Sequence, residues 1–528
     1  MTVPAQTTPL ALHEAARAYG DAPALADGEV RLDWAGLLAE VQRTARALLA
    51  RGVRRGDRVA MWAPNTHHWV VAALAAQYAG AALVPLNTRY VADEAADVLA
   101  RVHPAALFVS GTFLGRDRLA ELRAAAPELA IETVVVIPVE PGTAVPTDEH
   151  TLNWADLAAA AESVSPEAAE QRAREVEPDD LSDILFTSGT TGRSKGTLVA
   201  HRQALAVVRA WADCATLRTE DRYLVVNPFF HNFGYKAGIL ACVVTGATIV
   251  PQVTFDVPQT MRLIGSEKIT VLPGPPTIYQ TILDFPDRSS YDLSSLRVAV
   301  TGAATVPVVL IERMREDLAF EVVLTAYGLS ESAGFGTMCD ATDDATTVAN
   351  TCGRPIPGFE LKLADSGEVL LRGPNIMLGY LDDPEATAEA IDDEGWLHTG
   401  DIGTVDERGY LKITDRLKDM YISGGFNVYP AEVEQALARL DGVAESAVVG
   451  IPDERMGEVG KAYVVPKPGA TLTEDQVIAH AKTVLANFKV PRAIEFRDRL
   501  PYSAAGKVLK RHLRDSDKRD GEKREENS

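Results

Sequence analysis

The sequence predicts an α/β fold: a large N-terminal domain of largely parallel, helix-flanked sheets, followed by a smaller, mobile α+β C-terminal domain. Three observations support this prediction. At 528 residues the chain is too long for a single hydrophobic core. Strand and helix signals alternate through the first 416 residues, which is typical of parallel sheets covered by helices on both faces. After residue 416 short strands and helices follow over roughly 100 residues, a common size for one domain.

The composition is that of an ordinary globular protein with an excess of acidic residues. Hydrophobic residues make up 46% and charged residues 24%, and 52 basic against 74 acidic residues give a net charge of −22. This charge argues against nucleic acid or an anionic membrane as the main partner, although local basic residues can still bind a small anion. The four cysteines lack metal-type spacing, no secretory signal is apparent, and no apolar run reaches the ~20 residues that span a bilayer. We therefore expect a cytoplasmic protein without stable membrane insertion, and leave a homodimer open.

Capping residues and apolar periodicity predict the first elements. Asp33 is a typical helix N-cap, and apolar residues between Trp34 and Leu49 follow the 3.6-residue period until Gly52 ends the helix. The next segments predict a strand, a buried helix and a second strand: DRVAMWAP (57–64), HHWVVAALAAQYAG (67–80) and AALVPLN (81–87). Further strands are expected in ITVLPGPP (269–276), LRVAVTGAAT (296–305) and EVVLTAYGLS (321–330).

The chain is expected to divide into a domain over residues 1–416, a lid domain over residues 417–513 and a polar, disordered tail over residues 514–528. In the lid domain, Pro430 suits the first turn of a helix. The remaining lid elements are two strands, a helix and a last strand: ESAVVGIP (445–452), GKAYVVPK (460–467), EDQVIAHAKTVLA (474–486) and AIEFRD (493–498).

The segment TSGTTGRSKG (187–196) is the strongest candidate for chemistry. It directly follows apolar residues and combines glycines, hydroxyl groups and Lys195. Ordering glycine costs backbone entropy, so the cluster needs a reason. It is either an exposed linker, or a set of donors that surrounds the acceptor oxygens of a phosphate chain. Its spacing differs from that of the common P-loop, in which lysine directly follows the last glycine. We therefore interpret the segment as a mobile cover over phosphates.

Seven motifs, in the same order along the chain, resemble those of the adenylate-forming superfamily. This family includes acyl-CoA synthetases, the adenylation domains of peptide synthetases and beetle luciferases. The resemblance covers almost the whole chain, through TSGTTGRSKG (187–196), FFHNFG (229–234), TGAAT (301–305), YGLSES (327–332), HTGD (398–401), DRLKDMYISGG (415–425) and PYSAAGK (501–507).

The resemblance implies an ATP-dependent acyl-CoA synthetase. A carboxylate attacks the α-phosphate of ATP to give acyl-AMP and pyrophosphate, and a thiol, usually that of coenzyme A, then displaces AMP. The cofactors and co-substrates implied are ATP, Mg²⁺ and coenzyme A. Because an anion approaches a polyanion in the first step, cations and hydrogen-bond donors have to stabilise the developing charge.

The matched motifs imply the following roles. The β- and γ-phosphates are bound by Thr187, Ser188, Gly189, Thr190, Thr191, Gly192 and Lys195. The base or the acyl chain is contacted by Gly302, Ala303 and Ala304, while Tyr327, next to Gly328, stacks on adenine. This sequence has Ser194 where the family often has proline, which we expect to loosen the loop.

The remaining roles concern the α-phosphate, the metal, the ribose and the acceptor. Ser330, where the family more often has threonine, reaches the α-phosphate, and Glu331 holds Mg²⁺, a hard cation that prefers oxygen ligands. Asp401 accepts hydrogen bonds from the ribose hydroxyls, Arg416 donates to ribose or phosphate oxygens, and Lys507 reaches the reacting carboxylate and α-phosphate. The resemblance also places a hinge at Lys418 and a path for the pantetheine arm at Gly425.

The segment FFHNFGYKAG (229–238) bears on the acid. Peptide-synthetase domains commonly carry an aspartate near here that pairs with the substrate ammonium group, whereas this chain has aromatic residues and His231. We expect a carboxylic acid without an α-amino group, with His231 as a catalytic candidate, although this cluster fits ordinary core packing too. The pattern looks similar to that of actinobacterial ligases for steroid-derived propionates and related bulky alicyclic acids. The alternatives are an aryl- or fatty-acid–CoA ligase, a ligase that loads a carrier protein, a luciferase-type oxygenase and a catalytically silent binder.

Overall fold

The computed structural model describes residues 4–140, 148–187, 194–302, 306–417, 419–423, 426–453, 455–485, 487–502 and 508–514. The chain folds into two compact units, of which the first comprises Met1–Leu361 and Leu371–Leu397. The second comprises Lys362–Leu370 and His398–Ser528. The functional boundary expected between residues 416 and 417 stays a prediction. No helix in the described ranges is long and apolar enough to cross a membrane.

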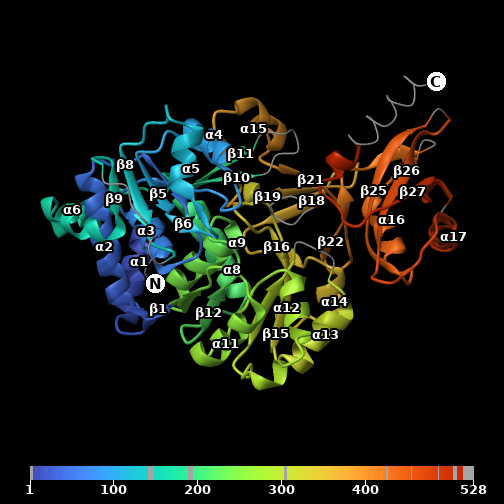
Figure 1. Cartoon of the computed structure of the whole chain (residues 1–528), viewed down its shortest axis with the longest axis horizontal. Coiled ribbons are helices and arrows are strands. Elements are labelled where there is room, and N and C mark those ends of the chain that lie inside the picture. The colour runs from blue at the N-terminus through green and yellow to red at the C-terminus, as the bar shows by residue number, and fades with distance from the viewer. Residues whose placement is uncertain are drawn as a thin grey trace. The chain divides into compact units, whose positions relative to one another are not determined.

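The largest sheet of the first unit has the strand order β20-β11-β10-β4-β3-β5-β8-β9. Its strands β11, β10, β5, β8 and β9 are labelled in Figure 1. From β10 to β9 all neighbours run parallel, whereas β11 is antiparallel to β10 and β20 is antiparallel to β11. All residues of β5 and β8 are buried, as expected for parallel strands covered on both faces. In sheet order the bounds are Gly379–Tyr380, Lys195–Ala200, Leu181–Thr187, Ala82–Pro85, Arg58–Trp62, Ala106–Ser110, Thr133–Ile137 and Thr151–Asn153.

Two further groups of strands in the first unit have the orders β12-β13-β1-β2 and β14-β15-β16-β17. Single parallel bridges at Val271 join β12 to β14. The strand expected over residues 269–276 is therefore wrong beyond this residue, because prolines in LPGPP have no N–H to donate to a ladder. The bounds are Arg222–Val225, Thr248–Pro251, Pro23–Asp27, Val30–Asp33, Val298–Thr301, Val322–Tyr327, Thr337–Met338 and Arg354–Pro355. A small hairpin pairs β6 (Thr112–Phe113) with β7 (Arg116–Asp117).

Several helices of the first unit begin at a residue whose side chain caps them. The predicted helix after Asp33 is α2, and its cap accepts a hydrogen bond from the Gly36 N–H at 2.6 Å. Helix α3 is apolar on all sides and almost wholly buried, as predicted. Helices α1 to α8 span Thr8–Tyr19, Trp34–Ala50, His67–Tyr78, Ala92–Val102, Arg118–Ala125, Leu157–Ala160, Pro166–Glu175 and His201–Cys214. Helices α9 to α15 span Asn232–Gly234, Ala241–Thr245, Val257–Glu267, Pro276–Leu283, Val308–Asp317, Ala345–Asn350 and Pro384–Ala390.

Short 3-10 turns and one π-helical segment complete the first unit. The π-helical segment η3 directly follows α9, and π-type turns are often found at functional sites. These segments are η1 (Trp154–Asp156), η2 (Ala161–Ser163), η3 (Tyr235–Leu240), η4 (Arg288–Ser290) and η5 (Ser330–Ser332).

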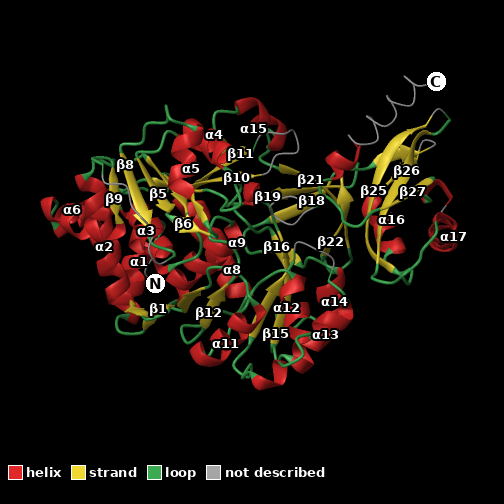
Figure 2. Ribbon diagram, in the orientation of Figure 1, coloured by secondary structure: helices red, strands yellow, loops and turns green. Residues whose placement is uncertain are grey.

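The described part of the second unit holds most of one sheet, whose strands β18, β19 and β21 begin or end in the first unit, and all of another sheet. It also holds the helices α16 and α17, which are labelled in Figure 2. One sheet has the order β18-β19-β21-β22, and the other has the order β24-β23-β26-β25 with β27 beside β26. The first sheet spans Glu360–Leu363, Glu368–Arg372, Leu397–Val405 and Leu411–Arg416. The second comprises Phe426–Val428, Tyr421–Ser423, Gly457–Pro466, Val443–Asp453 and Ala493–Phe496, with α16 (Pro430–Leu437), α17 (Glu474–Val484) and η6 (Asn487–Lys489).

The second unit has its own hydrophobic core, which includes Val433, Val448 and Val464. Each helix and strand expected in it from the sequence is present, and Pro430 is the first residue of α16. Arg514, placed by the sequence at the start of the tail, lies instead in a helical turn over residues 510–514 and pairs with Asp419 at 2.9 Å. The predicted disorder concerns residues 515–528, which lie outside the described residues.

Candidate active site

The two ends of the candidate phosphate loop are fixed on neighbouring antiparallel strands. Thr187 is the last residue of β10, Lys195 is the first residue of β11, and the two lie directly opposite one another. Both side chains are partly exposed. The loop residues Ser188, Gly189, Thr190, Thr191 and Gly192 lie outside the described residues, so their roles stay predictions.

Arg101, in the last turn of α4, contacts the segments on both sides of this loop. Its Nη1 donates to the Ser194 carbonyl oxygen at 2.7 Å, and its guanidinium carbon lies 5.0 Å from the centre of the Phe186 ring. Ser194 also lies near Tyr90, whose pKa is raised, mainly by burial. The described end of the loop is therefore anchored by contacts that its sequence does not reveal.

The adenine motifs follow the carboxyl ends of two parallel strands. Gly302 follows β14, and Tyr327 is the last residue of β15, its neighbour in the sheet. Ligands of α/β sheets usually bind beyond such strand ends. Gly328 needs to be glycine, because a Cβ there would lie 2.4 Å from the Gly334 carbonyl oxygen. Ala303 and Ala304 lie outside the described residues.

Tyr380 joins the predicted metal ligand to the predicted phosphate ligand. Its hydroxyl donates to Glu331 Oε1 at 2.7 Å, and Lys195 Nζ lies 5.0 Å from the centre of its ring. Burial raises the pKa of Tyr380 well above its usual range, and the neighbouring Glu331 carboxylate adds to the shift. Ser330 and Glu331 share η5. Tyr380 is not among the residues expected from the sequence, because its only local signal is its place in the segment MLGYLDD (377–383).

The FFHNFG segment divides between the core and the surface. Phe229 is fully buried and packs on Trp69 with ring centres 5.0 Å apart, which agrees with the core-packing alternative for this cluster. The predicted catalytic candidate His231 is exposed and caps α9, where its Nδ1 accepts from the Phe233 N–H at 3.2 Å. Phe233 is partly exposed and lies edge-on to Trp211.

A buried ion pair connects this segment to the strand that precedes the phosphate loop. Lys236 Nζ lies 2.7 Å from Asp183 Oδ1 on β10 and 2.9 Å from Asn232 Oδ1. Both charged side chains have zero exposure. Asn232 in turn lies against the loop that follows Tyr327. A Cβ added to Gly334 in that loop would lie 3.0 Å from the Cβ of Asn232. Three motif regions of the first unit therefore meet around Asn232.

In the second unit the structure brings the two predicted ribose ligands together. Asp401 on β21 lies directly opposite Arg416 on β22, and the Asp401 residue is only 4% exposed. The preceding turn is held by Glu368, which accepts from the Gly400 N–H at 2.9 Å and lies 3.1 Å from His398 Nδ1. The side chain of Arg416 lies outside the description, as do Lys418, Gly425 and Lys507.

The described residues suit a metal that is held jointly with a nucleotide. Among them no cluster of three or more His, Cys, Asp or Glu side chains could hold a metal ion. Mg²⁺ in nucleotide sites usually takes one or two protein carboxylates and completes its shell with phosphate oxygens and water. The carboxylate of Glu331, which is partly exposed and oriented by Tyr380, fits that need.

The family follows from comparison with known proteins. The profile of the AMP-binding enzyme family matches residues 12–381, and the C-terminal domain of AMP-binding enzymes matches residues 432–507. The chain therefore belongs to the AMP-binding enzyme family, and it is an ATP-dependent acid–thiol ligase of the acyl-CoA synthetase class.

Two bacterial relatives and one solved structure illustrate the similarity. A ligase from Rhodococcus jostii (strain RHA1), named for joining a 3-(7a-methyl-1,5-dioxo-octahydro-1H-inden-4-yl)propanoyl group to CoA, is 59% identical, covering 98% of this chain and all of the relative. The ligase of the same name from Mycobacterium tuberculosis (strain ATCC 25618 / H37Rv) is also 59% identical, over 97% of this chain and 99% of the relative. ATP-bound MatB from Rhodopseudomonas palustris superposes with a TM-score of 0.81 at 28% identity, over 97% of this chain and 98% of MatB.

Proposed function

We propose that this enzyme activates a bulky alicyclic propanoic acid. A carboxylate oxygen of the acid attacks the α-phosphorus of ATP and pyrophosphate leaves. The thiol of coenzyme A then attacks the acyl carbonyl carbon, and AMP leaves with the oxygen that bridged carbon and phosphorus. The 59% identity with ligases named for a bicyclic diketo propanoic acid supports this substrate class. Phe233 is partly exposed, and its ring is 6.1 Å from that of Phe335, which supports an apolar surface in this region.

The observation that carries the proposed chemistry is the meeting of Lys195 and Glu331 at Tyr380. Lys195 ends the candidate phosphate loop, and Glu331 carries a carboxylate suited to a cation. Both residues contact the side chain of Tyr380. We infer that Lys195 and the Thr187 hydroxyl contact the β- and γ-phosphates, and that Glu331 holds Mg²⁺. When bound, Mg²⁺ supplies positive charge to the phosphate oxygens as negative charge develops on them.

The other inferred roles concern the nucleoside and the reacting groups. In this proposal Tyr327 stacks on adenine beside Gly302 and Gly328, and Ser330 donates to the α-phosphate. Asp401 accepts from the ribose hydroxyls, with Arg416 opposite it, and Lys507 supplies a cation at the reacting carboxylate. The position of the buried Asp401 directly opposite Arg416 supports a joint role of the two residues. Ala303, Ala304, Gly425 and the loop residues Ser188–Gly192 keep their predicted roles. A cytoplasmic location and a homodimer also remain predictions.

A panel assay of pyrophosphate release tests the proposal. The purified enzyme receives ATP, Mg²⁺ and CoA with the bicyclic diketo propanoic acid, palmitate, ferulate or phenylalanine. We expect kcat/KM for the bicyclic acid to exceed that for each other acid by at least ~100-fold. The other acids differ from it by several carbon groups, and each such group that an apolar pocket gains or loses changes kcat/KM by about 10-fold or more. Equal turnover of phenylalanine or palmitate contradicts the proposed substrate class. Product formation with a pantetheinylated carrier protein but not with CoA contradicts the acceptor.

A further inference from the structure

Tyr380 contacts two side chains of opposite charge. Its hydroxyl donates a hydrogen bond to Glu331, and Lys195 lies over the face of its ring. A direct pair would neutralise both groups and compete with a phosphate for the ammonium and with a cation for the carboxylate. With the tyrosine between them, each group is oriented yet keeps its charge.

The backbone of Tyr380 is held firmly in this position. The Leu378 and Leu381 N–H groups donate to the carbonyl oxygens of Leu198 and Gly196 on β11, each at 2.8 Å. The Tyr380 N–H donates to Thr387 Oγ1 at 2.9 Å. Because Lys195 begins the same strand β11, the register of β20 against β11 sets where the lysine meets the ring.

The backbone of Glu331 is joined to the same segment. Its carbonyl oxygen accepts from the Met377 N–H at 2.8 Å, three residues before Tyr380. The fully buried Asn375 side chain donates to the Ser332 and Phe335 carbonyl oxygens at 2.8 and 3.1 Å. The segment from Asn375 to Tyr380 is therefore hydrogen-bonded both to η5 and to β11.

We propose that Tyr380 is a positioning residue of the nucleotide site, which orients Glu331 toward the divalent cation and holds Lys195 toward the same phosphates. This inference rests on the proposed function, since it assumes that Glu331 and Lys195 act on Mg²⁺-ATP. Tyr380 acts through these two residues. Its hydroxyl donates to the Glu331 carboxylate at 2.7 Å, and its ring face lies against Lys195.

The test measures nucleotide binding by calorimetry, with a non-reactive ATP analogue titrated in the presence of Mg²⁺ and in its absence. Tyr380→Phe keeps the ring and removes the hydroxyl. We expect it to weaken binding of the magnesium complex about 10-fold, as for partners that orient metal ligands, and to change binding of the metal-free analogue less than twofold. Tyr380→Leu also removes the ring face from Lys195 and should weaken both forms. The proposal is overturned if Tyr380→Phe weakens binding equally with and without Mg²⁺, or weakens binding in neither titration.

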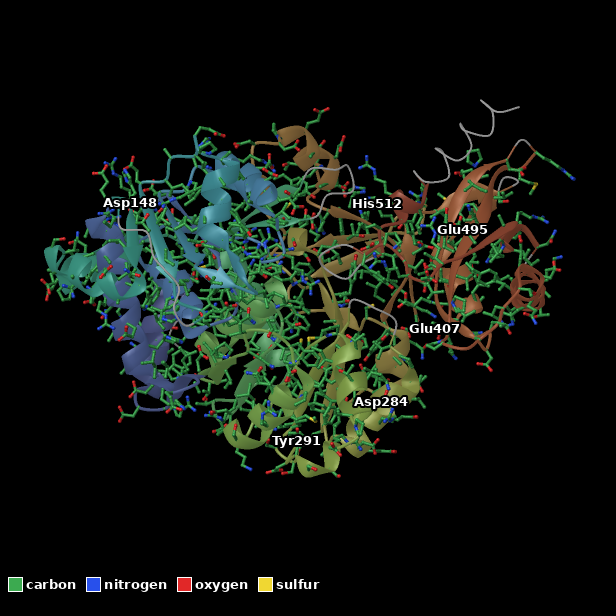
Figure 3. The ribbon with its side chains drawn as sticks, viewed as in Figure 1. Asp148, Asp284, Tyr291, Glu407, Glu495 and His512 are labelled. Carbon is green, nitrogen blue, oxygen red and sulfur yellow. The ribbon has the colours of Figure 1, made fainter. Side chains whose placement is uncertain are left out.

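A double variant separates positioning from a general structural effect. If Tyr380 acts through the Glu331 carboxylate, Tyr380→Phe should cost little further once Glu331→Gln has removed the metal ligand. A further 10-fold loss in that background overturns the proposal. Tyr291→Phe is the matched control, since Tyr291 (labelled in Figure 3) packs on Phe285 and takes no part in the site. A wild type that binds no nucleotide contradicts the proposed function itself, whereas normal binding without a Tyr380 effect contradicts only the positioning role.

Discussion

Lys236 and Asp183 carry a large electrostatic cost close to the site. Both side chains are fully buried, and burial lowers the pKa of Lys236 although the Asp183 charge opposes the shift. Removing two charges from water costs several kcal/mol for each ion, which the attraction between them has to offset. The pair ties η3 to β10, so we interpret it as a fixed link between the acyl motif and the phosphate-loop strand.

The first prediction concerns this pair. Lys236→Met should lower the free energy of unfolding by about 3–5 kcal/mol, because it leaves the Asp183 carboxylate buried without its counter-ion. The double variant Lys236→Met/Asp183→Asn should recover much of the loss, because no net charge is then buried. Urea denaturation measures both effects.

The exposed pair Lys268–Asp292 provides the control. Its side chains are 64% and 51% exposed, so Lys268→Met should cost less than about 1 kcal/mol. A double variant no more stable than Lys236→Met alone would show that the buried charge is not the cause.

At the scale of elements, α4 and the phosphate loop form one functional assembly. Arg101 in the last turn of α4 bonds the Ser194 carbonyl oxygen and covers Phe186, so it touches the chain on both sides of the loop. The loosening expected from Ser194 in place of proline is therefore opposed by a contact from a distant element. Ordering a loop costs conformational entropy that a binding site recovers only in part.

The second prediction is that Arg101→Ala raises KM for ATP about 10-fold in the adenylation assay, while the melting temperature changes little, because more of the binding energy then goes into ordering the loop. Arg101→Lys should give an intermediate value, since lysine lacks the planar group that covers Phe186. Arg123→Ala is the control, since Arg123 lies in the last turn of α5 and pairs at the surface with Asp148 (labelled in Figure 3) at 3.0 Å. An unchanged KM for ATP in Arg101→Ala would refute the anchoring role.

The elements that the sequence predicted well are those whose signals are local. Helices α2 and α3 follow from a cap and a run of apolar residues, and each needs only its own residues to be recognised. The strand expected over residues 269–276 does not form beyond Val271, because the prolines that follow have no N–H to donate to a neighbouring strand. Tyr380 could not be found in this way, because Glu331 is 49 residues away and the contact depends on how β20 pairs with β11.

For the whole molecule, the stability of the first unit depends on a buried neutral histidine. His201 begins α8, is 1% exposed and accepts from the Thr8 N–H at 3.3 Å, which ties α1 to α8. Burial lowers the pKa of His201 to about 4. The unfolded chain, with a histidine pKa near 6.5, therefore binds a proton before the folded chain does. The contribution of neutral His201 to the free energy of unfolding is therefore complete above pH 6.5 and is lost as the pH falls toward 4.

The third prediction is a pH dependence of stability. Between pH 6.5 and 4.5 the free energy of unfolding should fall, with His201 contributing up to about 1.4 kcal/mol per pH unit. His201→Gln can still accept from Thr8 but cannot bind a proton, so it should flatten this slope in urea titrations. His150→Gln, at an exposed histidine, is the control. An equal slope in wild type and His201→Gln would contradict the account.

The central claim, that the acid is activated by attack on the α-phosphate of ATP, is tested most directly by isotope transfer. The enzyme receives an acid carrying ¹⁸O in both carboxylate oxygens, together with ATP, Mg²⁺ and CoA, and the phosphate products are examined by mass spectrometry. Since the attacking oxygen stays on phosphorus when the thiol displaces AMP, the account predicts one ¹⁸O in AMP and none in pyrophosphate. Formation of ADP with ¹⁸O in inorganic phosphate would mean attack on the γ-phosphate and would contradict it.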